Sequence, residues 1–155
     1  MRVRRTIEGG RGMASRERVV FISHVAEEAQ VAGRLKELLE RAFGQEFVFL
    51  SSDYENLRGG DDWYDEIVRA LKGACVTVSL LSPQSVGKRW INFEAGVAIG
   101  AHEKSMPVIP VVFRGLRFGE IGHPLSPKHG RDLHEEAGVA ALLTDISEFT
   151  KAPQC

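Results

Sequence analysis

The feature that most constrains the fold is an alternation between short apolar runs and segments with helical spacing. The first of these runs, Val19-Val20-Phe21-Ile22, lacks strict alternation of apolar and polar residues, which is typical of a strand covered on both faces of a sheet. The predicted strands are Arg18–Ser23, Phe47–Leu50, Cys75–Leu81, Pro107–Phe113 and a short Arg131–His134. The predicted helices between and after them are Glu27–Phe43, Asp61–Leu71, Lys88–Glu103 and Glu135–Lys151.

This order of elements predicts βαβ units and a mostly parallel sheet. We therefore expect an α/β, flavodoxin-like three-layer sandwich, in which a central parallel sheet of about five strands is flanked by helices. The domain should span residues 16–151, with a disordered N-terminal tail at 1–15 and a C-terminal tail at 152–155. In such sheets, ligands bind outside the carboxyl ends of the strands, so polar residues at those ends are the candidate site residues.

Composition excludes several classes of function. The formal net charge of −1 gives no basic field for nucleic acid or for an anionic membrane. No apolar run approaches the roughly 20 residues that span a bilayer. The two cysteines, Cys75 and Cys155, argue against a disulfide framework and favour a reducing, cytoplasmic setting.

Motifs for the common cofactors and metals are also missing. The chain has no phosphate-binding loop of the P-loop type and no glycine fingerprint of the dinucleotide-binding type after a strand. The five histidines lack the spacing of metal ligands, so no metal site and no bound cofactor are expected. An acidic pair and a phospho-acceptor aspartate, which a response-regulator receiver needs at its strand ends, are replaced by Ser23 and Ser82.

One glutamate stands in an unexpected place on the third predicted helix. At 100° per residue, Glu94 falls in the middle of an apolar arc that includes Trp90, Val97 and Ala98. A carboxylate on an apolar face costs free energy unless it is paired or hydrogen-bonded, and such a cost is often kept for function. The alternative is a structural role, as a local salt bridge to a neighbouring Arg89 or Lys88 or as a cap for a loop.

Four short motifs, taken together, resemble the TIR domain family. They are Phe21-Ile22-Ser23-His24, Leu57-Arg58-Gly59-Gly60, Leu80-Leu81-Ser82-Pro83 and Trp90-x-x-x-Glu94, in the order and at the spacing of that family. The similarity covers roughly 18–116 well and is greatest to prokaryotic TIR proteins that cleave NAD⁺. The resemblance implies the TIR fold and a catalytic role for Glu94. It also implies that Trp90 forms a wall for ribose or nicotinamide, although a core anchor is the equal alternative.

The resemblance also implies a set of substrate-binding residues around the strand ends. Besides Trp90 these are Ser23, His24, Asp53, Asn56, Leu57, Gly59, Ser82 and Ser85. Each has a plainer alternative: His24 could be an exposed strand-end residue, and the two later serines could cap the third helix. The chain departs from its relatives at Val25-Ala26, where the axon-degeneration NADase carries a basic pair. Phosphate contacts would then come from Arg58, Lys88 or Arg89.

The implied function is an NAD⁺ glycohydrolase that releases nicotinamide and forms ADP-ribose or a cyclic ADP-ribose isomer. NAD⁺ is then the substrate, and the resemblance implies bacterial anti-phage defence or immune signalling as the setting. The expected partners are further copies of the chain, joined through the Ser51–Gly60 loop, and a fused or separate sensor protein. The main alternative is a non-enzymatic adaptor that works by TIR–TIR contact. A secreted effector that mimics host TIR domains is a third hypothesis, which no export signal supports.

Overall fold

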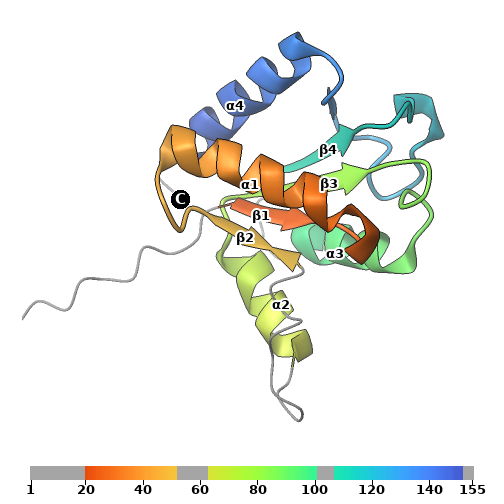
Figure 1. Ribbon diagram of the computed structural model, residues 1–155. Coiled ribbons are helices and arrows are strands. Elements are labelled where there is room, and N and C mark those ends of the chain that lie inside the picture. The colour runs from red at the N-terminus through yellow and green to blue at the C-terminus, as the bar shows by residue number, and fades with distance from the viewer. Residues whose placement is uncertain (1–19, 52–62, 101–106, 152–155) are drawn as a thin grey trace, which may run out of the picture.

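The sheet has the predicted parallel architecture. The computed structural model describes residues 20–51, 63–100 and 107–151. Its strands are β1 (Val20–Ser23), β2 (Val48–Leu50), β3 (Val76–Leu81), β4 (Val108–Val112) and β5 (Arg131–Asp132). All neighbouring pairs are parallel, in the order β2-β1-β3-β4-β5 (Figure 1). The prediction of an α/β fold with a five-stranded parallel sheet is confirmed.

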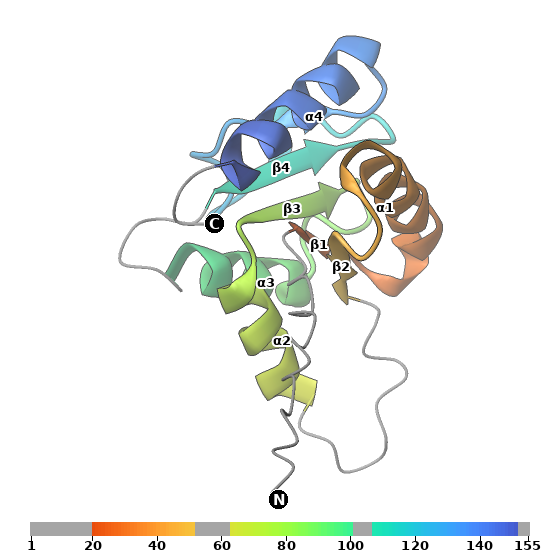
Figure 2. The same cartoon turned by 90° about the vertical axis from the view of Figure 1, so that its left-hand side faces the viewer.

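Helices cover both faces of this sheet (Figure 2). The α-helices are α1 (Ala29–Phe43), α2 (Trp63–Gly73), α3 (Arg89–Gly100) and α4 (Glu136–Thr150), and the short 3-10 helices are η1 (Ala26–Glu28) and η3 (Phe118–Glu120). α1 and α4 share one apolar cluster with the strands, and α2 and α3 share the other. The result is the three-layer sandwich expected from the sequence.

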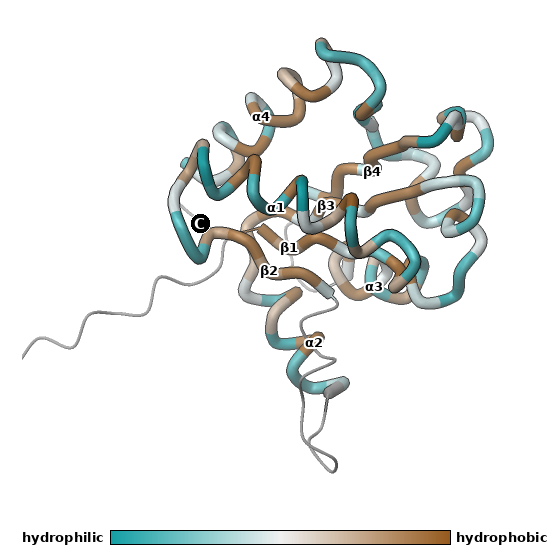
Figure 3. Tube along the Cα trace, viewed as in Figure 1, coloured by the Kyte–Doolittle hydropathy of each residue, from teal (hydrophilic) through white to brown (hydrophobic). Residues whose placement is uncertain are grey.

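The strands form the centre of the core because their side chains are buried on both faces. Every residue of β1, β3 and β4 is buried. Figure 3 shows these strands as mostly hydrophobic segments inside a shell of helices that carry hydrophilic stretches. This double burial is why the strands are rich in apolar residues, although β3 also buries the polar Thr77 and Ser79.

Most element boundaries differ from the predictions by one or two residues, as is usual at fraying ends, and the predicted end of the third helix at Glu103 lies outside the described residues. β2 begins at Val48 rather than Phe47, and α4 spans Glu136–Thr150 rather than Glu135–Lys151. The predicted first helix is divided, because residues 26–28 form a 3-10 turn before α1 begins. Gly44 ends α1 at a φ of 119°, which glycine adopts readily, and its N–H bonds to the carbonyl of Glu40.

Two further expectations can be compared with the described residues. Cys75 precedes β3, is half-buried and is disulfide-bonded, which departs from the expected reduced state. None of the described helices is long and apolar enough to cross a membrane.

Candidate active site

The carboxyl ends of β1 and β3 mark the point at which the chain changes direction across the sheet. From β1 the chain leads through α1 to β2 on one side, and from β3 it leads through α3 to β4 on the other. The two helices therefore lie on opposite faces, and a crevice opens between the loops that lead into them. The residues described below come from these loops and from the helix starts beside them.

Glu94 lies at this edge and is completely buried, as its place on the apolar arc of α3 predicts. The Ser23 hydroxyl at the end of β1 donates a hydrogen bond to Oε2 of Glu94. The Trp90 side chain, one helical turn earlier, also hydrogen-bonds to the carboxylate. The second oxygen, Oε1, has no hydrogen-bond partner. No ion pair to the exposed Arg89 or Lys88 forms within the described part of the chain, so the salt-bridge alternative is not supported.

Burial makes the carboxyl group of Glu94 a weaker acid. Removal from water raises the pKa of Glu94 from 4.5 to about 8, and the hydrogen bonds from Ser23 and Trp90 offset part of that rise. A carboxyl in this environment holds its proton at neutral pH unless a positive charge or further donors arrive beside it. Such perturbed groups concentrate at functional sites, where an ionisable side chain is kept out of water for chemical reasons.

A second buried carboxylate, Glu28 in η1, was not found from the sequence. Its exposed fraction is 1%, and its Oε1 accepts a hydrogen bond from the Ser82 hydroxyl. Its Oε2 has no hydrogen-bond partner. The pair Glu27-Glu28 follows a strand and precedes a helix, where acidic residues are ordinary because the helix dipole favours them. Only the packing distinguishes Glu28, which is buried, from Glu27, which is exposed.

The two serine–glutamate pairs are reciprocal. Ser23 ends β1 and holds the glutamate of α3, which follows β3. Ser82 follows β3 and holds the glutamate of η1, which follows β1. Each loop at the turning point thus anchors the carboxylate carried by the other, and both carboxylates keep one oxygen without a partner.

The structure corrects the expectation that His24 could be an exposed strand-end residue. His24 is 3% exposed, and its backbone N–H donates to the Ser51 hydroxyl at 3.0 Å. The Ser51 hydroxyl in turn lies 3.1 Å from the His24 carbonyl, to which it donates, and 3.2 Å from Nδ1 of the ring. These contacts join the end of β1 to the end of β2, so His24 and Ser51 shape the edge on which the carboxylates lie.

Ser82 and Ser85 do not cap α3, because the helix begins only at Arg89. Both serines are fully buried and stabilise the turn that follows β3. The Ser82 N–H donates to the Ser85 hydroxyl at 2.9 Å, and the Lys88 N–H donates to the Ser85 carbonyl at 2.9 Å. Their donors and acceptors are therefore used within the protein, which does not favour the phosphate-binding role considered for them.

Trp90 has the packing contacts of the core-anchor alternative, and its role as a wall for ribose or nicotinamide stays a prediction. It is half-buried and packs against the apolar cluster between the sheet, α2 and α3. Its ring stacks on Phe93 with 5.2 Å between centroids, and Phe93 also lies 5.6 Å from Tyr64 of α2. Trp90 is thus a packing residue that lies beside Glu94.

The remaining predicted contacts, Asp53, Asn56, Leu57 and Gly59, lie outside the described residues. Their substrate-binding role stays a prediction. Among the residues that the structure does describe, no group of three or more His, Cys, Asp or Glu side chains could hold a metal ion. Nε2 of His134 accepts a hydrogen bond from the Arg114 N–H at 2.8 Å.

Comparison with known proteins identifies the family. A family model for the TIR domain matches residues 20–143, which is most of the chain. The chain belongs to the TIR domain family. No curated protein sequence matches it. The prokaryotic NAD⁺-cleaving subtype remains part of the proposal below.

Solved structures with this fold come from receptors of several kinds. The TIR domain of the Toll-related receptor TRR-2 from Hydra magnipapillata has a TM-score of 0.64 at 18% identity, over 83% of this chain and 97% of that one. TIR domains of the activated Roq1 resistosome, which recognises the effector XopQ, give 0.61 at 17% identity, over 82% and 98%. A metazoan TIR-STING receptor from C. gigas gives 0.61 at 19% identity, over 86% of this chain but only 40% of the receptor. At these identities the likeness is one of fold.

Proposed function

We propose that this TIR domain is an NAD⁺ glycohydrolase in which Glu94 is the catalytic residue. The observation that carries the proposal is a fully buried carboxylate at the carboxyl edge of the sheet, with one oxygen hydrogen-bonded and the other without a hydrogen-bond partner. A purely structural glutamate on a helix would be expected either at the surface or fully paired.

The chemistry requires only one carboxylate. Cleavage of the bond between nicotinamide and ribose produces an oxocarbenium-like ribose, as glycoside cleavage does. The leaving nicotinamide departs as a neutral ring from a cationic one, so no general acid has to protonate it. An anion that binds the ribose hydroxyls and faces the developing positive charge stabilises the transition state, and Oε1 of Glu94 is available for that contact.

Substrate binding also supplies the charge that Glu94 needs. When no cation lies beside it, burial raises the pKa of Glu94 to about 8, so the carboxyl is protonated at neutral pH. The cationic nicotinamide ring of NAD⁺ beside it would favour the carboxylate and release the proton. Since Glu94 has no exposed surface, the substrate must displace a neighbour. Trp90 is half-buried whereas Ser23 is fully buried, so we propose that the Trp90 ring moves and then lies against the ribose or nicotinamide.

The test is chromatography of NAD⁺ incubated with concentrated purified protein, for wild type and Glu94→Gln. Glutamine keeps the size of the side chain but cannot carry the negative charge, so NAD⁺ cleavage should fall by on the order of 10²–10⁴-fold. Glu37→Gln, on the exposed face of α1, is the matched control and should cleave NAD⁺ as wild type does. Wild-type turnover by a folded Glu94→Gln variant would show that the assignment is wrong.

The same experiment distinguishes hydrolysis from cyclisation, because ADP-ribose and a cyclic isomer elute separately. It also tests the alternative, a non-enzymatic adaptor that acts by TIR–TIR contact, for which no NAD⁺ would be consumed at any protein concentration. The Roq1 domains are part of a resistosome, so assembly is known among structures with this fold. We propose that self-association through the Ser51–Gly60 loop, and recruitment by a sensor protein, regulate the enzyme in bacterial anti-phage defence or immune signalling.

A further inference from the structure

One buried polar residue takes no part in the contacts described above. Ser79 lies in β3, every residue of which is buried, and its hydroxyl has no hydrogen-bond partner among the residues that the structure describes. A buried hydroxyl without a partner destabilises the folded state. Nearly all such groups in native proteins bond to protein or to an ordered water molecule, so an unpartnered serine at this position requires an explanation.

The direction of the Ser79 side chain follows from the alternation along β3. Val78 and Leu80 belong to the apolar cluster shared with α1 and α4, whereas Leu81 belongs to the cluster shared with α2 and α3. Successive side chains of a strand point to opposite faces of a sheet. Ser79 therefore points toward the layer formed by α2 and α3, as Leu81 does, and this is the layer that carries Glu94.

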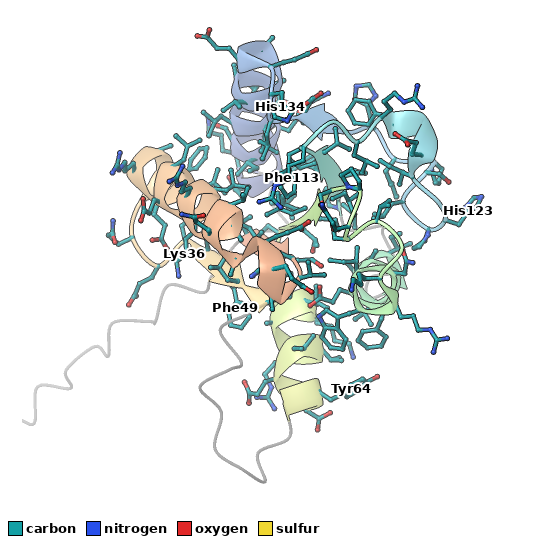
Figure 4. The ribbon with its side chains drawn as sticks, turned by 45° about the vertical axis from the view of Figure 1, so that its right-hand side comes forward. Lys36, Phe49, Tyr64, Phe113, His123 and His134 are labelled. Carbon is teal, nitrogen blue, oxygen red and sulfur yellow. The ribbon has the colours of Figure 1, made fainter. Side chains whose placement is uncertain are left out.

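β1 presents Ser23 to the same layer. Ser23 and Ser79 are register partners on neighbouring parallel strands, and the Ser23 hydroxyl donates to the Glu94 carboxylate of α3. Phe21, two residues before Ser23, stacks on Phe49 of β2 with 5.5 Å between ring centroids. Figure 4 shows Phe49 on the side of the sheet that faces α2. The two serine side chains are thus neighbours on the face of the sheet that α2 and α3 cover.

The spacing of the strands sets the distance between Ser79 and the carboxylate. Neighbouring strands lie about 4.8 Å apart, so the Ser79 hydroxyl is about one strand spacing from the hydrogen-bonded pair of Ser23 and Glu94. Two hydrogen bonds through a water molecule span up to about 5.6 Å, which is enough to cross that spacing. Oε1 of Glu94, like the Ser79 hydroxyl, is buried and has no hydrogen-bond partner within the described part of the chain.

We propose that Ser79 is a positioning residue for Glu94, linked to Oε1 of the carboxylate through one bound water molecule. The water accepts a hydrogen bond from Ser79 and donates one to Oε1, so both buried oxygens gain a partner. A carboxylate oxygen has two lone pairs, so Oε1 can still accept a hydrogen bond from a ribose hydroxyl. The benefit to catalysis rests on the proposed function, whereas the link between Ser79 and the carboxylate does not.

The charged groups around Glu94 leave room for this effect on its ionisation. β1, β3 and β4 carry no charged residue. The other buried titratable groups among the described residues are engaged elsewhere, since Nδ1 of His24 lies 3.2 Å from the Ser51 hydroxyl and Glu28 accepts from Ser82. The titratable side chains described in α2 and α3, apart from Glu94, are exposed; they are Tyr64, Asp65, Glu66, Arg69, Lys72 and Arg89.

The test is ¹³C NMR titration of the intact protein labelled at the glutamate carboxyl carbons, with the Glu94 signal assigned by its loss in Glu94→Gln. A hydrogen bond donated to the carboxylate lowers its pKa, so in Ser79→Ala the pKa of Glu94 should rise by about 0.5 to 1 relative to wild type. Ser79→Thr keeps the hydroxyl and should titrate as wild type does. Ser79→Val has nearly the shape of threonine without the hydroxyl and should behave as Ser79→Ala does.

A second control separates a local effect from a general one. Ser126→Ala removes an exposed hydroxyl from the loop after β4 and should leave the pKa of Glu94 at the wild-type value. Equal pKa values of Glu94 in wild type, Ser79→Ala and Ser79→Val would overturn the inference. An equal rise in Ser79→Thr and Ser79→Val would also overturn it, because packing and not the hydroxyl would be the cause.

These titrations use no NAD⁺, so their outcome is independent of the proposed function, which fails if wild type does not cleave NAD⁺. Where NAD⁺ is cleaved, Ser79→Ala should lower kcat at pH 7 by about three- to tenfold, because a smaller fraction of Glu94 is then ionised. The deficit should disappear as pH rises above the pKa of Glu94 in the variant. A deficit that stays constant at high pH would count against a positioning role for Ser79.

Discussion

Replacement of Glu94 by glutamine should change how the stability of the domain depends on pH. Burial raises the pKa of Glu94 from 4.5 to about 8 in the folded state, so between these values the folded domain holds a proton that the unfolded chain has released. The stability associated with that proton is complete below pH 4.5 and is lost as pH rises towards 8. The free energy of unfolding should fall by about 1.4 kcal/mol per pH unit across this interval.

Glutamine at position 94 resembles the protonated glutamate but does not titrate, so the variant should lack this slope. Relative to wild type, Glu94→Gln should gain up to about 4 kcal/mol of stability between pH 5 and pH 8. The magnitude is large because the carboxyl is fully buried and only partly compensated by its hydrogen bonds from Ser23 and Trp90.

Urea unfolding followed by far-ultraviolet circular dichroism, at four pH values from 5 to 8, measures this difference. Circular dichroism is preferable to tryptophan fluorescence because Trp90 lies beside the altered group. Other titrating groups cancel when the two proteins are compared at each pH, and Glu37→Gln should follow the wild-type curve. If the curves of wild type and Glu94→Gln are parallel over the whole range, Glu94 ionises near its ordinary pKa and the reasoning is refuted.

The pH dependence of kcat/KM should report the same carboxyl, rising through about pH 8, because the carboxylate is the form that binds the ribose. Ser23→Ala removes a hydrogen bond that lowers the pKa of Glu94, so the midpoint should move upward; a serine that is only structural would change the rate and leave the midpoint in place. Activity should also depend on assembly, because association costs monomers several kcal/mol of rigid-body freedom. Tethering on a scaffold at equal total concentration should raise NAD⁺ cleavage at least about tenfold. Equal rates for tethered and free protein would indicate a site complete in one monomer.

The sequence predicts the sheet well because its strands are buried on both faces. Short apolar runs such as Val108–Val112, rich in β-branched residues and placed between two helical segments, favour strands. The edge strand β5 is harder, since it has only the half-buried Arg131 and Asp132 and no apolar signal. The sequence predicts Arg131–His134, which is twice the extent of the strand in the structure.

Of the two buried carboxylates, one can be predicted from the sequence and the other cannot. Glu94 is visible in the sequence because it interrupts a helical apolar arc. The sequence does not single out Glu28, because an acidic residue is normal just before a helix. Its buried side chain is hydrogen-bonded to Ser82, which is 54 residues away. The bond between Ser23 and Glu94 spans 71 residues, and no local pattern encodes a contact of that kind. The pairing of loops across the turning point is a property of the fold.

The cost of these carboxylates favours catalysis over a purely adhesive role. Each removes a charged or polar group from water and leaves one oxygen without a partner, which destabilises the folded state. A domain that only docks onto copies of itself gains no affinity from these carboxylates, because they have no exposed surface. An apolar residue at position 94 would pack against Ile91, Ala95 and Ala98 without the cost of removing a carboxylate from water. A ligand that donates hydrogen bonds or positive charge to the two unpartnered oxygens removes the cost when it binds. These oxygens belong to glutamates of η1 and α3, which follow the two central strands, and they suit the cationic, hydroxyl-bearing substrate that we propose.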